Sequence, residues 1–221
     1  MKKLIHTTYK DFFKVNEFVA NTSPMRTHYH SKNPFEQLLW QKKLATMTEL
    51  FHSIPYNTVL DIGCGDGAGI ETIRSTASYT GIDISPTQLA YVKSQLPRLK
   101  KIHTGPLKLI QHDATTLPFK NQSMDLLIAC DVLEHVLRPE QLLREMKRVV
   151  KPNGFIFVSI PNEPIWELLR TLLLRFPARS PDHLSYIQET DVTRIFPTVK
   201  YKKYLPNIGG SFHLITLMLL Q

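Results

Sequence analysis

Short apolar segments alternate with segments of helical periodicity through most of the chain. The apolar segments are bounded by turn-forming residues and predict buried strands, which we expect at 59–62, 79–84, 108–113, 124–130 and 155–160. Between them the periodicity predicts helices at 68–76, 86–97 and 139–150. Strands that alternate with helices in this way form a parallel sheet with right-handed crossovers, so the pattern predicts an α/β fold.

Turn and cap signals mark several boundaries of these elements. Asn33 before Pro34, and Ser85 before Pro86, are each an N-cap followed by proline in the first turn of a helix. After Asn33 an apolar face recurs at spacings of three and four, formed by Trp40, Leu44, Met47, Phe51 and Ile54. Asn153-Gly154 predicts a turn that ends the helix at 139–150.

The C-terminal part departs from this alternation. Two strand-like runs, at 198–205 and 211–220, flank a glycine-containing turn and predict an antiparallel hairpin. The segment before them, 162–197, is longer than a simple crossover needs, and it contains a strongly apolar helix at 166–176. We therefore expect one domain at 58–221 that meets its substrate at the insertion 162–197, preceded by a helical cap or lid region at 1–57.

Composition and charge narrow the class of protein. A chain of 221 residues with 43% hydrophobic and 21% charged residues is an ordinary globular domain. The formal net charge of +8 favours anionic partners, although no long basic run is present. The two cysteines, Cys64 and Cys130, indicate a reducing compartment, and no apolar stretch is long enough for a signal peptide or a membrane span, so we expect a cytoplasmic protein with at most peripheral membrane contact.

The stretch 59–69, VLDIGCGDGAG, is the first candidate for a ligand site. It predicts a buried strand that ends in glycines and turns into a helix, and the glycines allow close approach of the backbone to a ligand. Asp61 and Asp66 lie within it, and it contains no Lys or Arg. A loop with this charge suits a cationic cofactor and repels a pyrophosphate.

Acidic residues also follow the next three predicted strands. Asp83, Asp113 and Asp131 lie at or just past strand ends, which line the ligand crevice of an open parallel sheet. Asp83 is well placed for a ribose diol, and Asp113 could accept a hydrogen bond from an adenine amino group, with the backbone of Ala114 nearby. Each of these residues could singly be a helix cap, but with Asp61 they predict a nucleotide site.

Five motifs in this order resemble the class I S-adenosylmethionine-dependent methyltransferases, in particular the quinone and small-molecule enzymes. They are DIGCGDG, GIDIS at 81–85, HDATTLPF at 112–119, DLLIACDVLEHV at 125–136 and RVVKPNGFIFVSIPN at 148–162. The resemblance implies a three-layer Rossmann-like fold with a mostly parallel seven-stranded sheet and an antiparallel last strand. In KPNG, Asn153 replaces the family's usual glycine, and we expect no loss because Asn tolerates a left-handed conformation.

The resemblance also implies which residues bind S-adenosylmethionine, whose product is S-adenosylhomocysteine. Asp61 and Gly63 would face the methionine moiety and Asp131 the edge near the sulfonium. The expected cofactor-binding set is Asp61, Gly63, Cys64, Gly65, Gly67, Asp83, Ile84, Asp113, Ala114 and Asp131. Gly63, Gly65 and Ala68 also satisfy a loose dinucleotide fingerprint, but the acidic loop and the roughly 60 residues left after the fifth strand argue against a dehydrogenase with its own substrate domain.

An oxygen nucleophile would need a base, because the sulfonium activates only the methyl group. His135, next to Glu134, and His183, in the insertion, are the candidates, although the favoured interpretation of His135 is a structural residue that packs the start of a helix. We expect no metal as the main case. The alternative is that Asp131, Glu134 and His135 bind Mg or Mn, because their spacing resembles the metal site of some quinone and small-RNA methyltransferases.

The sequence thus predicts a methyltransferase that acts on a small acceptor, at oxygen. The apolar helix at 166–176 favours a hydrophobic acceptor. Two alternatives stay open: an RNA 2'-O-methyltransferase, which the net charge of +8 would suit, and a catalytically silent cofactor-binding or scaffolding protein. The oligomeric state has no signal in the sequence.

Overall fold

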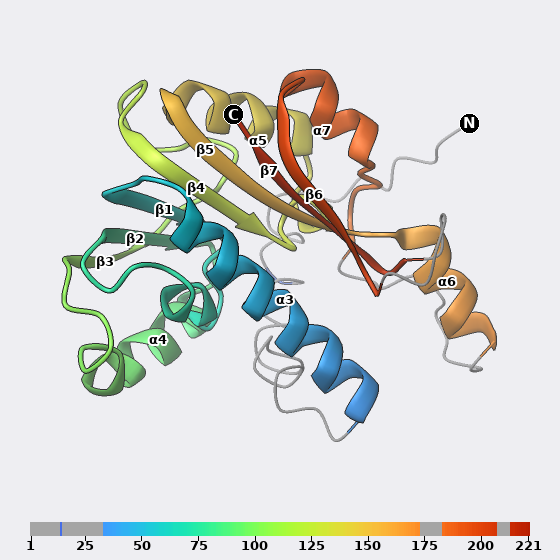
Figure 1. Ribbon diagram of the computed structural model, residues 1–221, viewed down its shortest axis with the longest axis horizontal. Helices are drawn as coiled ribbons and strands as arrows, with labels where there is room; N and C mark the ends of the chain where they lie inside the picture. The colour runs from blue at the N-terminus through green and yellow to red at the C-terminus, as the bar shows by residue number, and fades with distance from the viewer. Residues whose placement is uncertain (1–13, 15–32, 173–182, 207–212) are drawn as a thin grey trace.

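The computed structural model describes residue 14 and residues 33–172, 183–206 and 213–221. Its centre is a seven-stranded sheet in the order β3-β2-β1-β4-β5-β7-β6 (Figure 1). The strands are β1 (Thr58–Ile62), β2 (Ser78–Asp83), β3 (Leu107–Gln111), β4 (Met124–Cys130), β5 (Val150–Pro161), β6 (Val199–Leu205) and β7 (Ile215–Leu220). Neighbours from β3 to β5 pair in parallel, whereas β7 is antiparallel to both β5 and β6, which confirms the predicted sheet.

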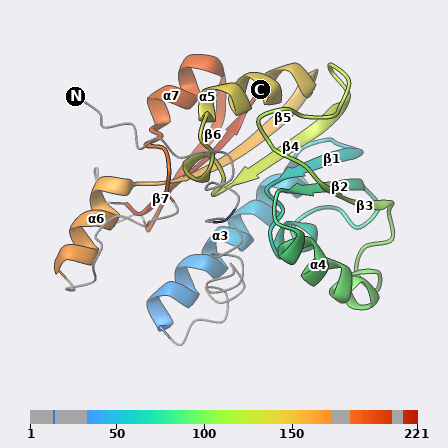
Figure 2. The same cartoon turned by 180° about the vertical axis from the view of Figure 1, so that it is seen from behind.

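Helices cover both faces of this sheet and make three layers. Side chains of α3 (Pro34–Ser53) and α4 (Pro86–Leu99) join one apolar core, and those of α5 (Pro139–Val149) and α7 (Glu189–Ile195) join the other. A further helix, α6 (Glu163–Leu172), projects away from the sheet beyond the end of β5 in both views (Figures 1 and 2). None of the described helices has both the length and the apolar character needed to cross a bilayer.

Helix α3 begins as predicted and packs directly on the sheet. The Asn33 Oδ1 atom accepts a hydrogen bond from the Phe35 N–H at 2.9 Å, and Phe51 meets the ring of Phe157 on β5 edge-on, with centroids 5.2 Å apart. The buried face holds the predicted Met47 but also Lys43, whose side chain is completely buried. The apolar periodicity of the sequence did not predict that this lysine is buried.

Two local predictions are wrong. The expected helix at 68–76 is only a 3₁₀ turn, η1 (Ala68–Glu71). It does not continue as an α-helix because the Thr72 hydroxyl donates to the Gly69 carbonyl at 2.8 Å and the Arg74 N–H donates to the Tyr56 hydroxyl. No turn separates α5 from β5. Gly154 lies inside β5, where an added Cβ would come within 2.8 Å of the Asp125 carbonyl oxygen.

Asn153 in the KPNG motif does not adopt the left-handed conformation that was expected to make it tolerable there. Among described residues other than glycine, a positive φ occurs only at Gln122 and Asp131, so Asn153 takes no left-handed conformation. It lies within the extended strand β5. The pairing of β5 with β4 shifts in register between Met124 and Leu126 of β4. Asn153 fits here as an ordinary strand residue at an irregular position.

The C-terminal hairpin is confirmed in its strands, while its turn at 207–212 lies outside the described residues. The apolar helix begins at Glu163, three residues earlier than expected, and its predicted end at 173–176 is outside the described residues too. The short helix α7 was not predicted. The first part of the expected cap or lid region, residues 1–13 and 15–32, also falls outside what the structure describes.

Candidate active site

The glycine loop after β1 forms the floor of a pocket. Gly63 has a φ of +64°, and a Cβ there would lie 2.6 Å from a methyl group of Val132, so only glycine fits. The Cys64 N–H donates to the Ile82 carbonyl at 2.9 Å, which ties the loop to β2. The pocket is lined by Leu44, Met47, Asp61, Gly63, Cys64, Gly65, Asp66, Ala68, Gly69, Ile128 and Cys130.

The charge of this pocket is negative. Asp61 and Asp66 contribute carboxylates, and no lysine or arginine is among the lining residues. Leu44 and Met47 reach the pocket from α3. Burial raises the pKa of the Cys64 thiol well above its usual value, so Cys64 is a small packing residue. The lining fits a cationic group and would repel a pyrophosphate.

Asp61 is the most buried carboxyl group of the loop. It is 3% exposed and accepts a hydrogen bond from the Tyr79 hydroxyl at 2.7 Å. Burial raises its pKa to about 7, and the carboxylates of Asp83 and Asp66 add to the rise although the Tyr79 bond opposes it. The negative charge of Asp61 is therefore easily stabilised by a cation that enters the pocket.

This pKa predicts a pH-dependent affinity for a cationic ligand. Because burial favours the neutral form of Asp61, raising the pH from about 6 to about 7.5 ionises the carboxyl group and should tighten binding of S-adenosylmethionine several-fold. Titration calorimetry at a series of pH values measures this. Asp61→Asn should give a flat profile over the same range, and an equally steep profile in that variant would contradict the assignment.

Asp83 joins the loop to the start of α4. Its Oδ2 accepts from the Gly65 N–H and its Oδ1 from the Ser85 N–H, each at 2.8 Å. Ser85 is the N-cap of α4, as predicted. Asp83 and the following Ile84 are partly exposed at the end of β2, beside the glycine loop.

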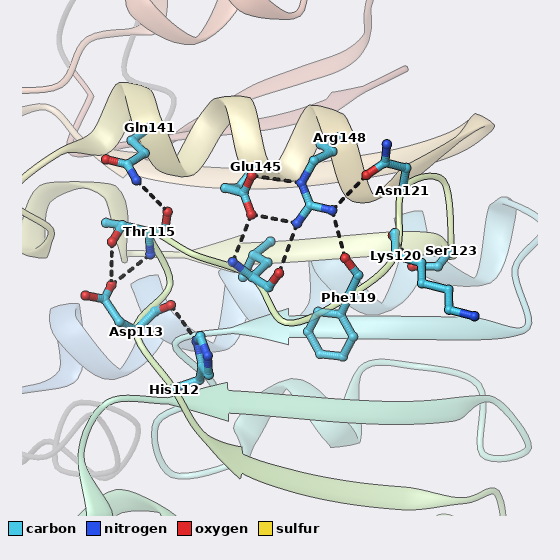
Figure 3. A network of polar contacts seen from close by, with 11 residues as sticks. His112, Asp113, Thr115, Phe119, Lys120, Asn121, Ser123, Gln141, Glu145 and Arg148 are labelled. Carbon is cyan, nitrogen blue, oxygen red and sulfur yellow. Dashed lines mark hydrogen bonds and ion pairs between the residues drawn. The ribbon is translucent and has the colours of Figure 1, made fainter.

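Asp113 and Ala114 lie just past β3, at the start of a loop that α5 anchors (Figure 3). The Oδ1 atom of Asp113 accepts from both the backbone and the hydroxyl of Thr115, each at 2.8 Å. Further along the loop, the Arg148 guanidinium donates to the carbonyls of Leu117 at 2.9 Å and Phe119 at 2.7 Å. Arg148 thus fixes the position of the loop on which Asp113 begins.

Loss of this anchor should loosen the loop. Arg148→Met removes charge-assisted bonds to two carbonyls and to Glu145, and we expect a loss of about 1.5–3 kcal/mol in the free energy of unfolding. Arg144→Met is the matched control, because Arg144 is exposed on the same helix. Urea denaturation measures both variants, and equal stability of the two would contradict the anchoring role.

Asp131 ends β4 in a way that the sequence did not indicate. Its φ of +54° turns the chain sharply, and its Oδ1 accepts from the Ser159 hydroxyl at 2.5 Å. Its Oδ2 forms an ion pair with the fully buried ammonium group of Lys43. Burial lowers the pKa of Lys43, but the interactions with Asp131 and Cys130 together outweigh this, so the net shift of the pKa is upward. The negative charge of Asp131 is therefore already compensated by a side chain of α3.

The two candidate histidines lie side by side. Their rings are 4.9 Å apart and nearly perpendicular, although they are far apart in the sequence. His135 belongs to the 3₁₀ turn η2 (Leu133–His135), and the segment after His183 is tied to it because the Ser185 N–H donates to the Glu134 carbonyl at 3.1 Å. The Nδ1 atom of His183 pairs with a carboxylate oxygen of Glu163, a residue that the sequence reasoning missed.

In the folded chain, Asp131 does not belong with Glu134 and His135, the residues with which its spacing suggested a metal site. Glu134, His135 and His183 have ligating atoms that all lie within 4.8 Å of one another, whereas Asp131 is occupied by Lys43 and Ser159. Burial raises the pKa of Glu134, and the nearby Asp131 adds to that rise. The group formed by Glu134, His135, His183 and Glu163 is called the histidine cluster below.

Known proteins resemble this chain in the region of the pocket and beyond it. A family model described as a methyltransferase domain matches residues 60–158. The chain is 28% identical over 165 residues to a probable S-adenosylmethionine-dependent methyltransferase of Mycolicibacterium smegmatis, covering 74% of this chain and 58% of that relative. It thus spans little more than half of that protein's length.

Two further comparisons extend over nearly the whole chain. The demethylmenaquinone methyltransferase of Listeria welshimeri is 28% identical over 226 aligned positions, which cover 90% of this chain and 92% of the relative. Among solved structures, magnesium protoporphyrin IX methyltransferase from Synechocystis PCC 6803, with bound S-adenosylhomocysteine, superposes with a TM-score of 0.71 at 17% identity, covering 95% of this chain and 98% of that one. The latter likeness concerns the fold.

Proposed function

We propose that this chain, as a class I S-adenosylmethionine-dependent methyltransferase, transfers the cofactor's methyl group to an oxygen atom of a small, hydrophobic acceptor. The observation that carries the proposal is the acidic, glycine-floored pocket with the histidine cluster at the neighbouring strand end. Asp61 and Asp66 supply negative charge where the cofactor carries positive charge, and the partly exposed Asp83 lies at the end of the next strand.

Each group has a task in this proposal. Bound S-adenosylmethionine supplies a methyl group already activated on its sulfonium, so that the S–CH₃ bond breaks as the O–CH₃ bond forms and S-adenosylhomocysteine leaves. The residues of the chain align the cofactor, exclude water and promote loss of the acceptor's proton. We assign the first two tasks to the glycine loop with Leu44 and Met47 above it, and the third to the region of His135 and His183.

The hydrophobic character of the acceptor is supported by two observations. Helix α6 projects from the end of β5 and exposes Leu168 (49%) and Leu172 (68%) beside Arg170. The relative that aligns over most of this chain is named for a quinone, demethylmenaquinone. Exposed leucines next to the expected substrate entrance favour an apolar acceptor over a polar metabolite or RNA.

Methyl-labelled cofactor tests the proposal. Purified protein is incubated with labelled S-adenosylmethionine and a cell extract, which is then divided into lipid-soluble compounds, polar small molecules, RNA and protein. We expect label in the lipid-soluble fraction as an alkali-stable methyl ether or an alkali-labile ester, both of which are O-methyl products. Label confined to RNA or to polar solutes, or no transfer despite cofactor binding, would contradict it.

A further inference from the structure

The histidine cluster contains a buried carboxylate oxygen that lacks a partner. Glu134 is 2% exposed, and its Oε2 has no hydrogen-bond partner among the described residues. Burial of a carboxylate without compensation is costly, so proteins normally pair such a group with a donor, a cation or a metal. No described lysine or arginine pairs with Glu134, since the buried Lys43 forms its ion pair with Asp131.

Two imidazoles converge on the same place. His135 is the next residue on η2, and His183 is brought in by the segment that Ser185 ties to the turn, with the Ser185 hydroxyl donating to the Leu133 carbonyl at 2.8 Å. One ligating atom from each of Glu134, His135 and His183 lies within 4.8 Å of the others. Only small side-chain shifts would bring three atoms so placed to metal-bond distance of one ion.

A second carboxylate stands behind His183. Glu163, 3% exposed at the start of α6, pairs with Nδ1 of His183. This contact assigns the proton to Nδ1 and leaves the lone pair of Nε2 for another partner. A carboxylate that orients a histidine in this way is the usual outer-shell support of a metal-bound imidazole.

We propose that Glu134, His135 and His183 bind one divalent transition-metal ion, with Glu163 as the positioning residue of His183. Two imidazoles and one carboxylate suit Mn²⁺, Fe²⁺, Co²⁺ or Zn²⁺, whereas Mg²⁺ and Ca²⁺ prefer oxygen ligands throughout. Asp131 is not a ligand, because Lys43 and Ser159 occupy its two oxygens.

The role of this ion rests on the proposed function. A cation beside the acceptor's hydroxyl lowers the pKa of that hydroxyl, so its proton passes to water and the resulting alkoxide or phenolate oxygen takes the methyl group. The charge balances, since the cationic sulfonium becomes the neutral thioether of S-adenosylhomocysteine as one proton is released. In this role the ion replaces the general base that was sought among the two histidines.

Direct metal binding tests the proposal without any acceptor. Protein without a polyhistidine tag is stripped with a chelator and titrated with Co²⁺, followed by visible absorption, and with Mn²⁺ and Zn²⁺ in a calorimeter. We expect one ion per chain, a loss of affinity of at least about 100-fold in Glu134→Gln and in His183→Ala, and a loss of about 10- to 100-fold in Glu163→Gln. His52→Ala is the matched control, because His52 is exposed on α3.

The outcomes separate this proposal from the proposed function. Absence of metal binding by the wild type, or unchanged affinity in Glu134→Gln and His183→Ala, would overturn the site. Binding of S-adenosylmethionine checks the fold of each variant, and the partly exposed His183 provides the decisive variant if Glu134→Gln does not fold. If the stripped protein still methylates its acceptor at full rate, the catalytic role of the ion is overturned while methyl transfer stands.

Discussion

Replacement of Lys43 by Met is expected to lower the free energy of unfolding by about 3–5 kcal/mol, because it leaves the carboxylate of Asp131 buried without its cation. The Lys43 side chain is fully buried and that of Asp131 is 9% exposed, so water cannot replace the lost partner. Urea denaturation followed by circular dichroism measures the loss.

Lys42→Met is the matched control for this change. Lys42 is the preceding residue of α3 and is exposed, so its replacement should alter stability by no more than about 0.5 kcal/mol. Adding Asp131→Asn to Lys43→Met should restore part of the loss, since the unpaired charge is removed as well. Equal stability of Lys43→Met and Lys42→Met would contradict a stabilising role of the buried ion pair between Lys43 and Asp131.

Asp83→Ala is expected to weaken binding of S-adenosylmethionine by about 1–3 kcal/mol, measured by calorimetry. Beyond the expected contact with the ribose, Asp83 holds the Gly65 and Ser85 N–H groups, so its removal also frees the glycine loop. Asp83→Asn keeps an oxygen acceptor and should weaken binding less than Asp83→Ala does.

Glu140→Ala controls for the loss of a negative charge elsewhere, because Glu140 is exposed on α5. It should leave the affinity for S-adenosylmethionine unchanged. Wild-type affinity in Asp83→Ala would contradict the assignment of the end of β2 to the cofactor.

The parts of the fold that depend on local sequence were predictable. The bounds of β4 were predicted to the residue, and the caps of α3 and α4 at Asn33 and Ser85 are as expected, because apolar runs and cap residues act through their immediate neighbours. The prediction of a helix at 68–76 was wrong for the opposite reason, since the Arg74 N–H donates to the hydroxyl of Tyr56, which lies outside that segment. Periodicity within a segment contains no signal for such a contact.

The candidate site shows the same division between local and distant contacts. The glycine loop and its acidic residues were recognisable from one stretch of chain, whereas the pair of Lys43 with Asp131 joins residues 88 positions apart. Spacing alone grouped Asp131 with Glu134 and His135, but the positive φ at Asp131 leaves its carboxylate paired with Ser159 and Lys43 instead. The approach of His183 to His135, and the presence of Glu163 behind it, could be learned only from the folded chain.

The acidic pocket as the site of S-adenosylmethionine is tested most directly by calorimetric titration of the wild-type protein with that cofactor, and with NAD⁺ for comparison. One molecule of S-adenosylmethionine should bind per chain, with no measurable heat from NAD⁺, because Asp61 and Asp66 favour a cation and repel a pyrophosphate. Tighter binding of NAD⁺, or no binding of S-adenosylmethionine, would contradict this.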